Sequence, residues 1–152
     1  MEGMYKVCEV KLTYSTKVKS SERACIASSL DAYQFLIKHI YDPETIQYRE
    51  YLKILLLNRG QKVLGVVPIS EGGIDSTCAD IRIIMQAAIL GNASGIILTH
   101  NHPSGNVQPS KQDDVLTERL RDAAKLFDIR LLDHIIISDC GYYSYLDEGR
   151  LL

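Results

Sequence analysis

The stretch GIILTHNHPSGNVQPSKQDD, residues 95–114, joins an apolar run to a sharp turn and the start of a helix. His100 and His102 end the apolar run, and residues i and i+2 of an extended chain point to the same side. The two imidazoles are therefore predicted to face one point. The Pro and Gly residues that follow turn the chain, and Ser110 is placed to cap a helix that has Asp113 in its first turn. This turn can bring Asp113 back toward the two histidines.

Two histidines and one carboxylate are a common catalytic zinc set, in which a water molecule takes the fourth position. The ion lowers the pKa of that water to about 7, so that hydroxide exists at neutral pH. His100, His102 and Asp113 are therefore the candidate Zn²⁺ ligands, and Ser110 is a candidate donor to the oxyanion. Ser110 and Asp113 also resemble a capping box, which forms with or without a metal.

Hydrophobic patterns on both sides of this stretch indicate an α/β fold. The runs YLKILLLN (51–58) and KVLGVVPIS (62–70) flank a turn and predict an antiparallel hairpin near the centre of a sheet. Residues 80–90 have helical spacing with a broad apolar face, which predicts a well-buried helix, and LLDHIII (131–137) predicts another strand. Strands and helices do not alternate strictly, so we expect a mixed β-sheet flanked by helices.

The N-terminal part has its own pattern. Residues 4–14 alternate and predict a half-buried strand, whose edge could pair with another chain in a homo-oligomer. Residues 28–40 predict a helix, and Asp42 and Pro43 predict the start of the next one.

Composition excludes several classes of protein. The 152 residues are 46% hydrophobic and 24% charged, as in an ordinary soluble domain, and the net charge of −2 does not support a protein built mainly to bind DNA. No apolar run approaches the roughly 20 residues of a membrane span. There is no export signal and the four cysteines are scattered, so a cytoplasmic location is expected.

The motif resembles the RadC family, within the JAB/MPN superfamily of JAMM metalloproteases. The superfamily pattern is a distant Glu, then His-x-His, seven residues, Ser, two residues and Asp, and this chain matches its spacing from His100 to Asp113. The form HNHPSG, the LLLN segment (55–58) and LLDHIII match the family as well. The resemblance covers residues 44–152, which we expect to form the metal-binding domain. Residues 1–43 are expected to be a strand-and-helix extension without the helix-hairpin-helix region that RadC proteins usually carry.

The resemblance implies a cytidine-deaminase-like fold and a Zn²⁺-dependent hydrolase acting on a peptide, an isopeptide or another amide. It places the general base at Glu50, at a strand entrance, and Glu71 is the alternative. Two other functions remain open. One is a DNA-repair or mobile-element module that binds DNA or a protein without hydrolysis, and the other is a zinc-stabilised interaction domain. His134 is interpreted as a strand-end histidine satisfied by the backbone in preference to a partner of a zinc ligand.

Overall fold

The computed structural model describes residues 17–72 and 79–151, and within them one five-stranded sheet has the order β2-β1-β3-β4-β5. The strands are β1 (Tyr51–Leu57), β2 (Val63–Glu71), β3 (Gly95–Asn101), β4 (Arg130–Ile137) and β5 (Tyr142–Ser144). Neighbouring strands are antiparallel except β3 and β4, which are parallel. The expected mixed α/β architecture is confirmed.

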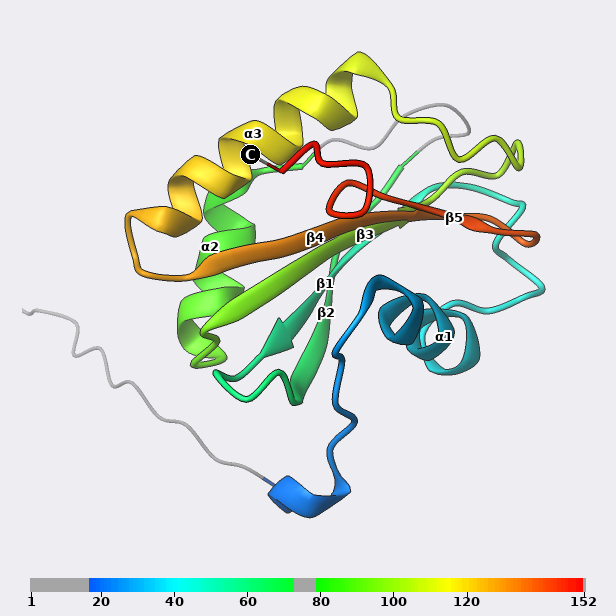
Figure 1. Ribbon diagram of the computed structural model, residues 1–152. Coiled ribbons are helices and arrows are strands. Elements are labelled where there is room, and N and C mark those ends of the chain that lie inside the picture. Colours follow the sequence, from blue (N-terminus) through cyan, green and yellow to red (C-terminus); the bar gives the residue numbers. More distant parts are fainter. Residues whose placement is uncertain (1–16, 73–78, 152) are drawn as a thin grey trace, which may run out of the picture.

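The helices cover both faces of this sheet. They are α1 (Ser29–His39), α2 (Ile81–Leu90) and α3 (Lys111–Lys125), preceded by a short 3₁₀ turn, η1 (Ser20–Glu22). Figure 1 shows α2 and α3 on one face of the sheet and α1 on the other. Each helix begins at a side-chain cap, since Ser28, Asp80 and Ser110 accept hydrogen bonds from backbone amides of the following turn.

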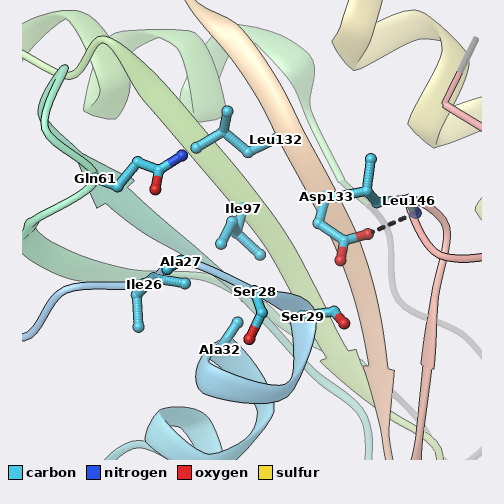
Figure 2. A pocket seen from close by; sticks show the side chains of 10 residues that line it. All are labelled: Ile26, Ala27, Ser28, Ser29, Ala32, Gln61, Ile97, Leu132, Asp133 and Leu146. Atoms are coloured by element: carbon cyan, nitrogen blue, oxygen red, sulfur yellow. Dashed lines mark hydrogen bonds between the residues drawn. The ribbon is translucent and has the colours of Figure 1, made fainter.

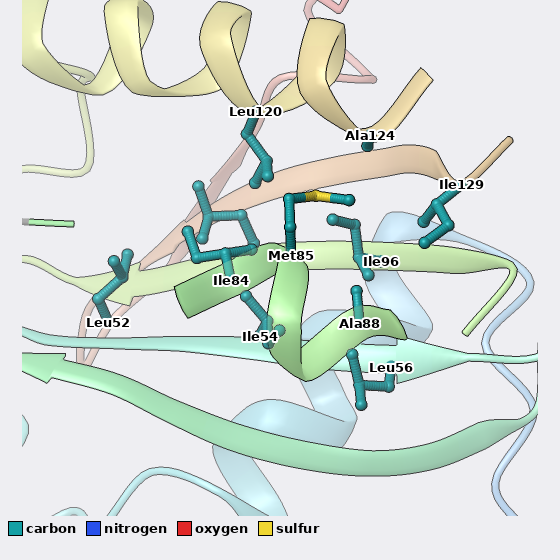
Figure 3. Close-up of a cluster of buried hydrophobic side chains, with 11 residues drawn as sticks. Leu52, Ile54, Leu56, Ile84, Met85, Ala88, Ile96, Leu120, Ala124 and Ile129 are labelled. Atoms are coloured by element: carbon teal, nitrogen blue, oxygen red, sulfur yellow. The ribbon is translucent and has the colours of Figure 1, made fainter. Parts of the chain in front are cut away.

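Two hydrophobic clusters lie on the two faces. The larger joins α2 and α3 to the even-numbered residues of β1 and β3 (Figure 3). The other joins α1 to the odd-numbered residues of the same strands. Because side chains alternate along a strand, Glu50 and His100 share the face that α2 and α3 cover. These two candidate site residues therefore lie on the same face of the sheet as the larger cluster.

Three local predictions were wrong. Strand β2 lies at the edge of the sheet, not near its centre. Asp42 does accept a hydrogen bond from the amide of Glu44, but the residues after it form successive turns instead of a helix. Helix α2 is only partly buried, because Ile83 and Leu90 are 48% and 59% exposed and only one side of the helix meets the sheet.

Strand β4 contains a register shift. Ile96 pairs with Leu131, but Ile97 pairs with Asp133, so Leu132 is an extra residue in the ladder. Elsewhere, the strand predicted over residues 4–14 lies outside the described residues. No helix in the described part of the chain is long and apolar enough to cross a membrane.

Candidate metal centre

The structure brings His100, His102 and Asp113 together at the C-terminal end of β3. Their ligand atoms all lie within 4.8 Å of one another. The two Nε2 atoms are 2.9 Å apart, and His100 Nε2 lies 3.3 Å from Asp113 Oδ1. His102 Nε2 lies 3.7 Å from Asp113 Oδ2. These are the three ligands expected from the sequence, and their donor atoms converge on one point.

Local structure explains why they converge. His100 is the sixth residue of β3, and His102 follows directly after the strand with its amide bonded to the carbonyl of Ile137. This bond continues the ladder with β4, so the i, i+2 relation holds beyond the assigned strand. Gly105, with φ of 84°, makes the turn that leads into α3, in a conformation that favours glycine. Asp113 then lies in the first helical turn and faces the histidines.

The Nδ1 atom of each imidazole already has a protein partner. His102 Nδ1 lies 2.6 Å from the carbonyl oxygen of Asn106, which can only accept, so Nδ1 carries the proton. His100 Nδ1 lies 2.9 Å from His134 Nε2. Only the Nε2 atoms are left to face the centre. Two nitrogen lone pairs 2.9 Å apart repel each other unless a proton or a metal ion lies near both. The donor set therefore suits a cation.

Asp113 remains negatively charged at this centre. Burial raises the pKa of Asp113, but the nearby imidazoles of His100 and His102 and a hydrogen bond from the Ser110 amide outweigh it and hold the pKa well below its usual range. Burial lowers the pKa of His102, but Asp113, the Asn106 carbonyl and the nearby charge of Glu50 together raise it above its usual value. The centre is thus an electrostatically negative position lined by two imidazoles.

Ser110 forms the capping box expected from the sequence. Its hydroxyl accepts a hydrogen bond from the Asp113 amide at 3.2 Å and donates one to Asp113 Oδ2 at 2.8 Å. The Ser110 amide donates to the same carboxylate oxygen at 2.8 Å. The structure therefore shows Ser110 fixing the orientation of Asp113. Donation to a substrate oxyanion would require its hydroxyl to turn away from that carboxylate.

The two candidate general bases are placed very differently. Leu52 pairs with His100, Glu50 lies two residues before Leu52, and its charge raises the pKa of His102. Glu50 is only 8% exposed. Glu71 is the last residue of the edge strand β2, and its 60% exposed side chain lies 3.6 Å from Arg49. Position and burial favour Glu50 over Glu71 as the candidate general base.

His134 contacts a residue of the centre, so the preferred interpretation of it as a backbone-satisfied histidine was wrong. It is fully buried, and its two ring nitrogens face His100 and Thr117. The ring of Tyr145 stacks on it, with centroids 4.8 Å apart and planes 7° from parallel. Sequence reasoning missed Thr117 altogether. Its position four residues after Asp113, on the same helical face, was the available signal.

Asp133, the residue before His134, is buried on the other face of the sheet. It lines a pocket on the α1 side of the sheet with Leu132 and Ala32 (Figure 2). Its carboxylate accepts hydrogen bonds from the Ser144 hydroxyl and from the amide of Leu146, and Figure 2 marks the bond from Leu146. Burial raises the pKa of Asp133 to about 6 despite these bonds.

Comparison with known proteins identifies the family of this chain. The family model of the RadC-like JAB domain matches residues 26–150 of this chain. A UPF0758 protein from Porphyromonas gingivalis is 43% identical over 141 residues, covering 90% of this chain and 60% of that protein. UPF0758 proteins from Flavobacterium johnsoniae and Thermotoga maritima are each 37% identical over 124 residues, or 82% of this chain. The chain thus spans between half and two thirds of the length of these relatives. It belongs to the family of RadC-like JAB domains.

Proposed function

We propose that this domain is a zinc-dependent hydrolase of the JAMM type, which cleaves a peptide, isopeptide or other amide bond. The observation that carries the proposal is the convergence of His100, His102 and Asp113 with both Nε2 atoms facing the centre. Family membership supports it, because the JAB domain is the setting in which this motif is expected.

The donor set fits zinc. Tetrahedral ligands about 2.0–2.1 Å from a zinc ion lie about 3.3 Å from one another. The separation of the two Nε2 atoms, 2.9 Å, and that of His100 Nε2 from Asp113 Oδ1, 3.3 Å, lie around this value, and the other oxygen of Asp113, Oδ2, lies 3.7 Å from His102 Nε2. His100, His102 and Asp113 would hold the ion and leave a fourth position open. A zinc ion bound there lowers the pKa of a water molecule to about 7 and polarises a carbonyl group.

Glu50 supplies the proton transfer that amide hydrolysis needs. Its carboxylate takes a proton from the attacking water and delivers it to the nitrogen of the departing amine. Its burial restricts competing contacts with solvent. Such proton transfer by a positioned side chain contributes about 10²- to 10⁴-fold to the rate.

Ser110 has two roles in this proposal. Its hydroxyl orients Asp113, as observed, and donates to the substrate oxygen as negative charge develops there. The second role requires a rotation about the Cα–Cβ bond of Ser110, which an exposed side chain can make. An amide, a peptide and an isopeptide share the same reacting group, so each of them suits this chemistry.

The test begins with metal content. Protein purified without chelator is analysed as wild type, as His102→Ala and as His39→Ala, a control on the exposed histidine of α1. The proposal expects about one zinc per chain, lost only in His102→Ala. No zinc in the wild type, even after zinc is added back, would overturn it.

Turnover is then measured with fluorogenic peptides and with peptides joined through a lysine ε-amide. Zinc-dependent release that Glu50→Gln abolishes would support the hydrolase. Zinc bound with no open coordination position, seen by X-ray absorption spectroscopy, would instead indicate an interaction domain.

A further inference from the structure

His100 and Asp113 of the candidate centre come from different elements, and a buried chain of hydrogen bonds connects them. His100 Nδ1 on β3 lies 2.9 Å from His134 Nε2 on β4. His134 Nδ1 lies 2.6 Å from Thr117 Oγ1 on α3. Thr117 Oγ1 lies 2.6 Å from the carbonyl oxygen of Asp113, one helical turn earlier. The chain therefore runs from one expected ligand to the backbone of another.

The direction of each hydrogen bond follows from the number of protons available. A carbonyl oxygen can only accept, so the single hydroxyl proton of Thr117 goes to Asp113. Thr117 Oγ1 must then accept from His134, which places the proton of His134 on Nδ1. His134 is fully buried and therefore neutral, so its Nε2 carries a lone pair. That lone pair accepts a hydrogen bond from the N–H group at His100 Nδ1.

The consequence reaches the centre itself. With its proton on Nδ1, neutral His100 presents a bare Nε2 to the position that it shares with His102 and Asp113. The stacked ring of Tyr145 keeps the plane of His134 fixed, and the Tyr145 hydroxyl donates to Asp114 at 2.8 Å. The geometry of the bridge is thus held from β4, from α3 and from the C-terminal segment.

We propose that His134 and Thr117 are positioning residues that set the tautomer of His100 and tie it to Asp113, so that the metal site is formed before the ion arrives. This inference rests on the proposed metal site. Partners of this kind, which bind the far nitrogen of a metal-ligating histidine, change metal affinity by about 10- to 100-fold when removed.

The first experiment compares Thr117→Val with Thr117→Ser. Valine keeps the shape of threonine but has no hydroxyl, whereas serine keeps the hydroxyl and loses only a methyl group. Zinc affinity is measured by competition with a chromogenic chelator, and thermal unfolding of the metal-free proteins checks that each is folded. We expect Thr117→Val to bind zinc about 10- to 100-fold more weakly and Thr117→Ser to bind nearly as the wild type does.

The outcomes separate this inference from the proposed function. If the wild type binds no zinc, the proposed function fails. If the wild type binds zinc and Thr117→Val binds it equally well, the positioning role is wrong while the proposed function stands. Equal weakening in both variants would indicate a packing effect, and would also overturn the role of the hydroxyl.

A second measurement needs no variant. Long-range ¹H–¹⁵N spectra of the metal-free wild type at about pH 8, well above the usual histidine pKa, report which ring nitrogen carries the proton. We expect the Nδ1-protonated form for both His100 and His134. An Nε2-protonated His100 would contradict the direction of the whole chain and overturn the proposal.

Discussion

The side-chain amide of Asn101 holds the backbone on both sides of Glu50. Its Oδ1 accepts from the amide of Tyr51 at 2.8 Å, and its Nδ2 donates to the carbonyl of Arg49 at 2.9 Å. Nδ2 donates as well to the carbonyl of Ile46 at 2.6 Å. A residue between the two histidines of the centre therefore fixes the segment that carries the proposed base.

Asn101→Ala removes these three hydrogen bonds from a fully buried position and leaves their backbone partners unsatisfied. We expect the free energy of unfolding of the metal-free protein to fall by about 3 kcal/mol, measured by urea denaturation. Asn106→Ala, in the exposed loop nearby, is the control and is expected to cost less than about 1 kcal/mol. Equal losses in the two variants would show that the Asn101 amide does not stabilise this segment.

Glu50→Gln keeps the shape of the side chain but removes its ability to take a proton. We expect the zinc content to be unchanged and the rate of amide hydrolysis to fall by at least about 100-fold. Glu71→Gln is the matched control, since Glu71 is exposed and lies against Arg49. Loss of activity in the Glu71 variant with retention in the Glu50 variant would reverse the assignment of the base.

Two substitutions of Ser110 separate capping from catalysis. Ser110→Ala is expected to lower the free energy of unfolding by about 1 kcal/mol, whereas Ser110→Gly costs only a few tenths, because glycine is tolerated at a helix N-cap. Both variants lack the hydroxyl, so both are expected to lose about 10²-fold or more in hydrolysis rate. Normal turnover in Ser110→Gly would leave Ser110 with the capping role alone.

Asp133 makes folding stability depend on pH. Its pKa is about 6 in the folded protein and about 4 when unfolded, so its stabilising contribution is complete below pH 4 and is lost as the pH rises through 6. A difference of about two pKa units corresponds to about 3 kcal/mol. Relative to Asp133→Asn, we therefore expect the wild type to lose about 3 kcal/mol of unfolding free energy between about pH 4 and pH 7.

This difference is measured by urea denaturation of both metal-free proteins across the pH range. The subtraction cancels the titration of groups that the two proteins share. Parallel curves for wild type and Asp133→Asn would mean that the buried carboxylate titrates with its ordinary pKa.

The sequence predicts most of the local structure, because the signals are short in range. Alternation, turn residues and caps locate the β1–β2 hairpin, α1 and α3. The position of β2 at the sheet edge depends on which strands pair with it. The exposure of Ile83 depends on which side of α2 faces the sheet. No pattern within these segments encodes either.

The same distinction applies to the candidate centre. His100, His102 and Asp113 lie within 14 residues of chain, so a strand end, a turn and a helix start suffice to bring them together. His134 and Thr117 meet only because β4 pairs in parallel with β3 and α3 packs over both. The helical spacing from Asp113 points to Thr117, but the contact between Thr117 and His134 depends on tertiary register, which no local pattern gives.

The extra residue in β4 decides which face of the sheet His134 occupies. Leu131 packs toward α2 and α3, whereas Leu132 and Asp133 both lie toward α1. If β4 alternated strictly from Leu131 onward, with the same residues and no bulge, the imidazole of His134 would turn to the α1 side. Every residue of the centre would still be present, yet His100 would lose its partner. Deleting Leu132 would also remove the bulge, but it would leave His134 on the face of the centre, because Asp133 would then follow Leu131 in regular alternation.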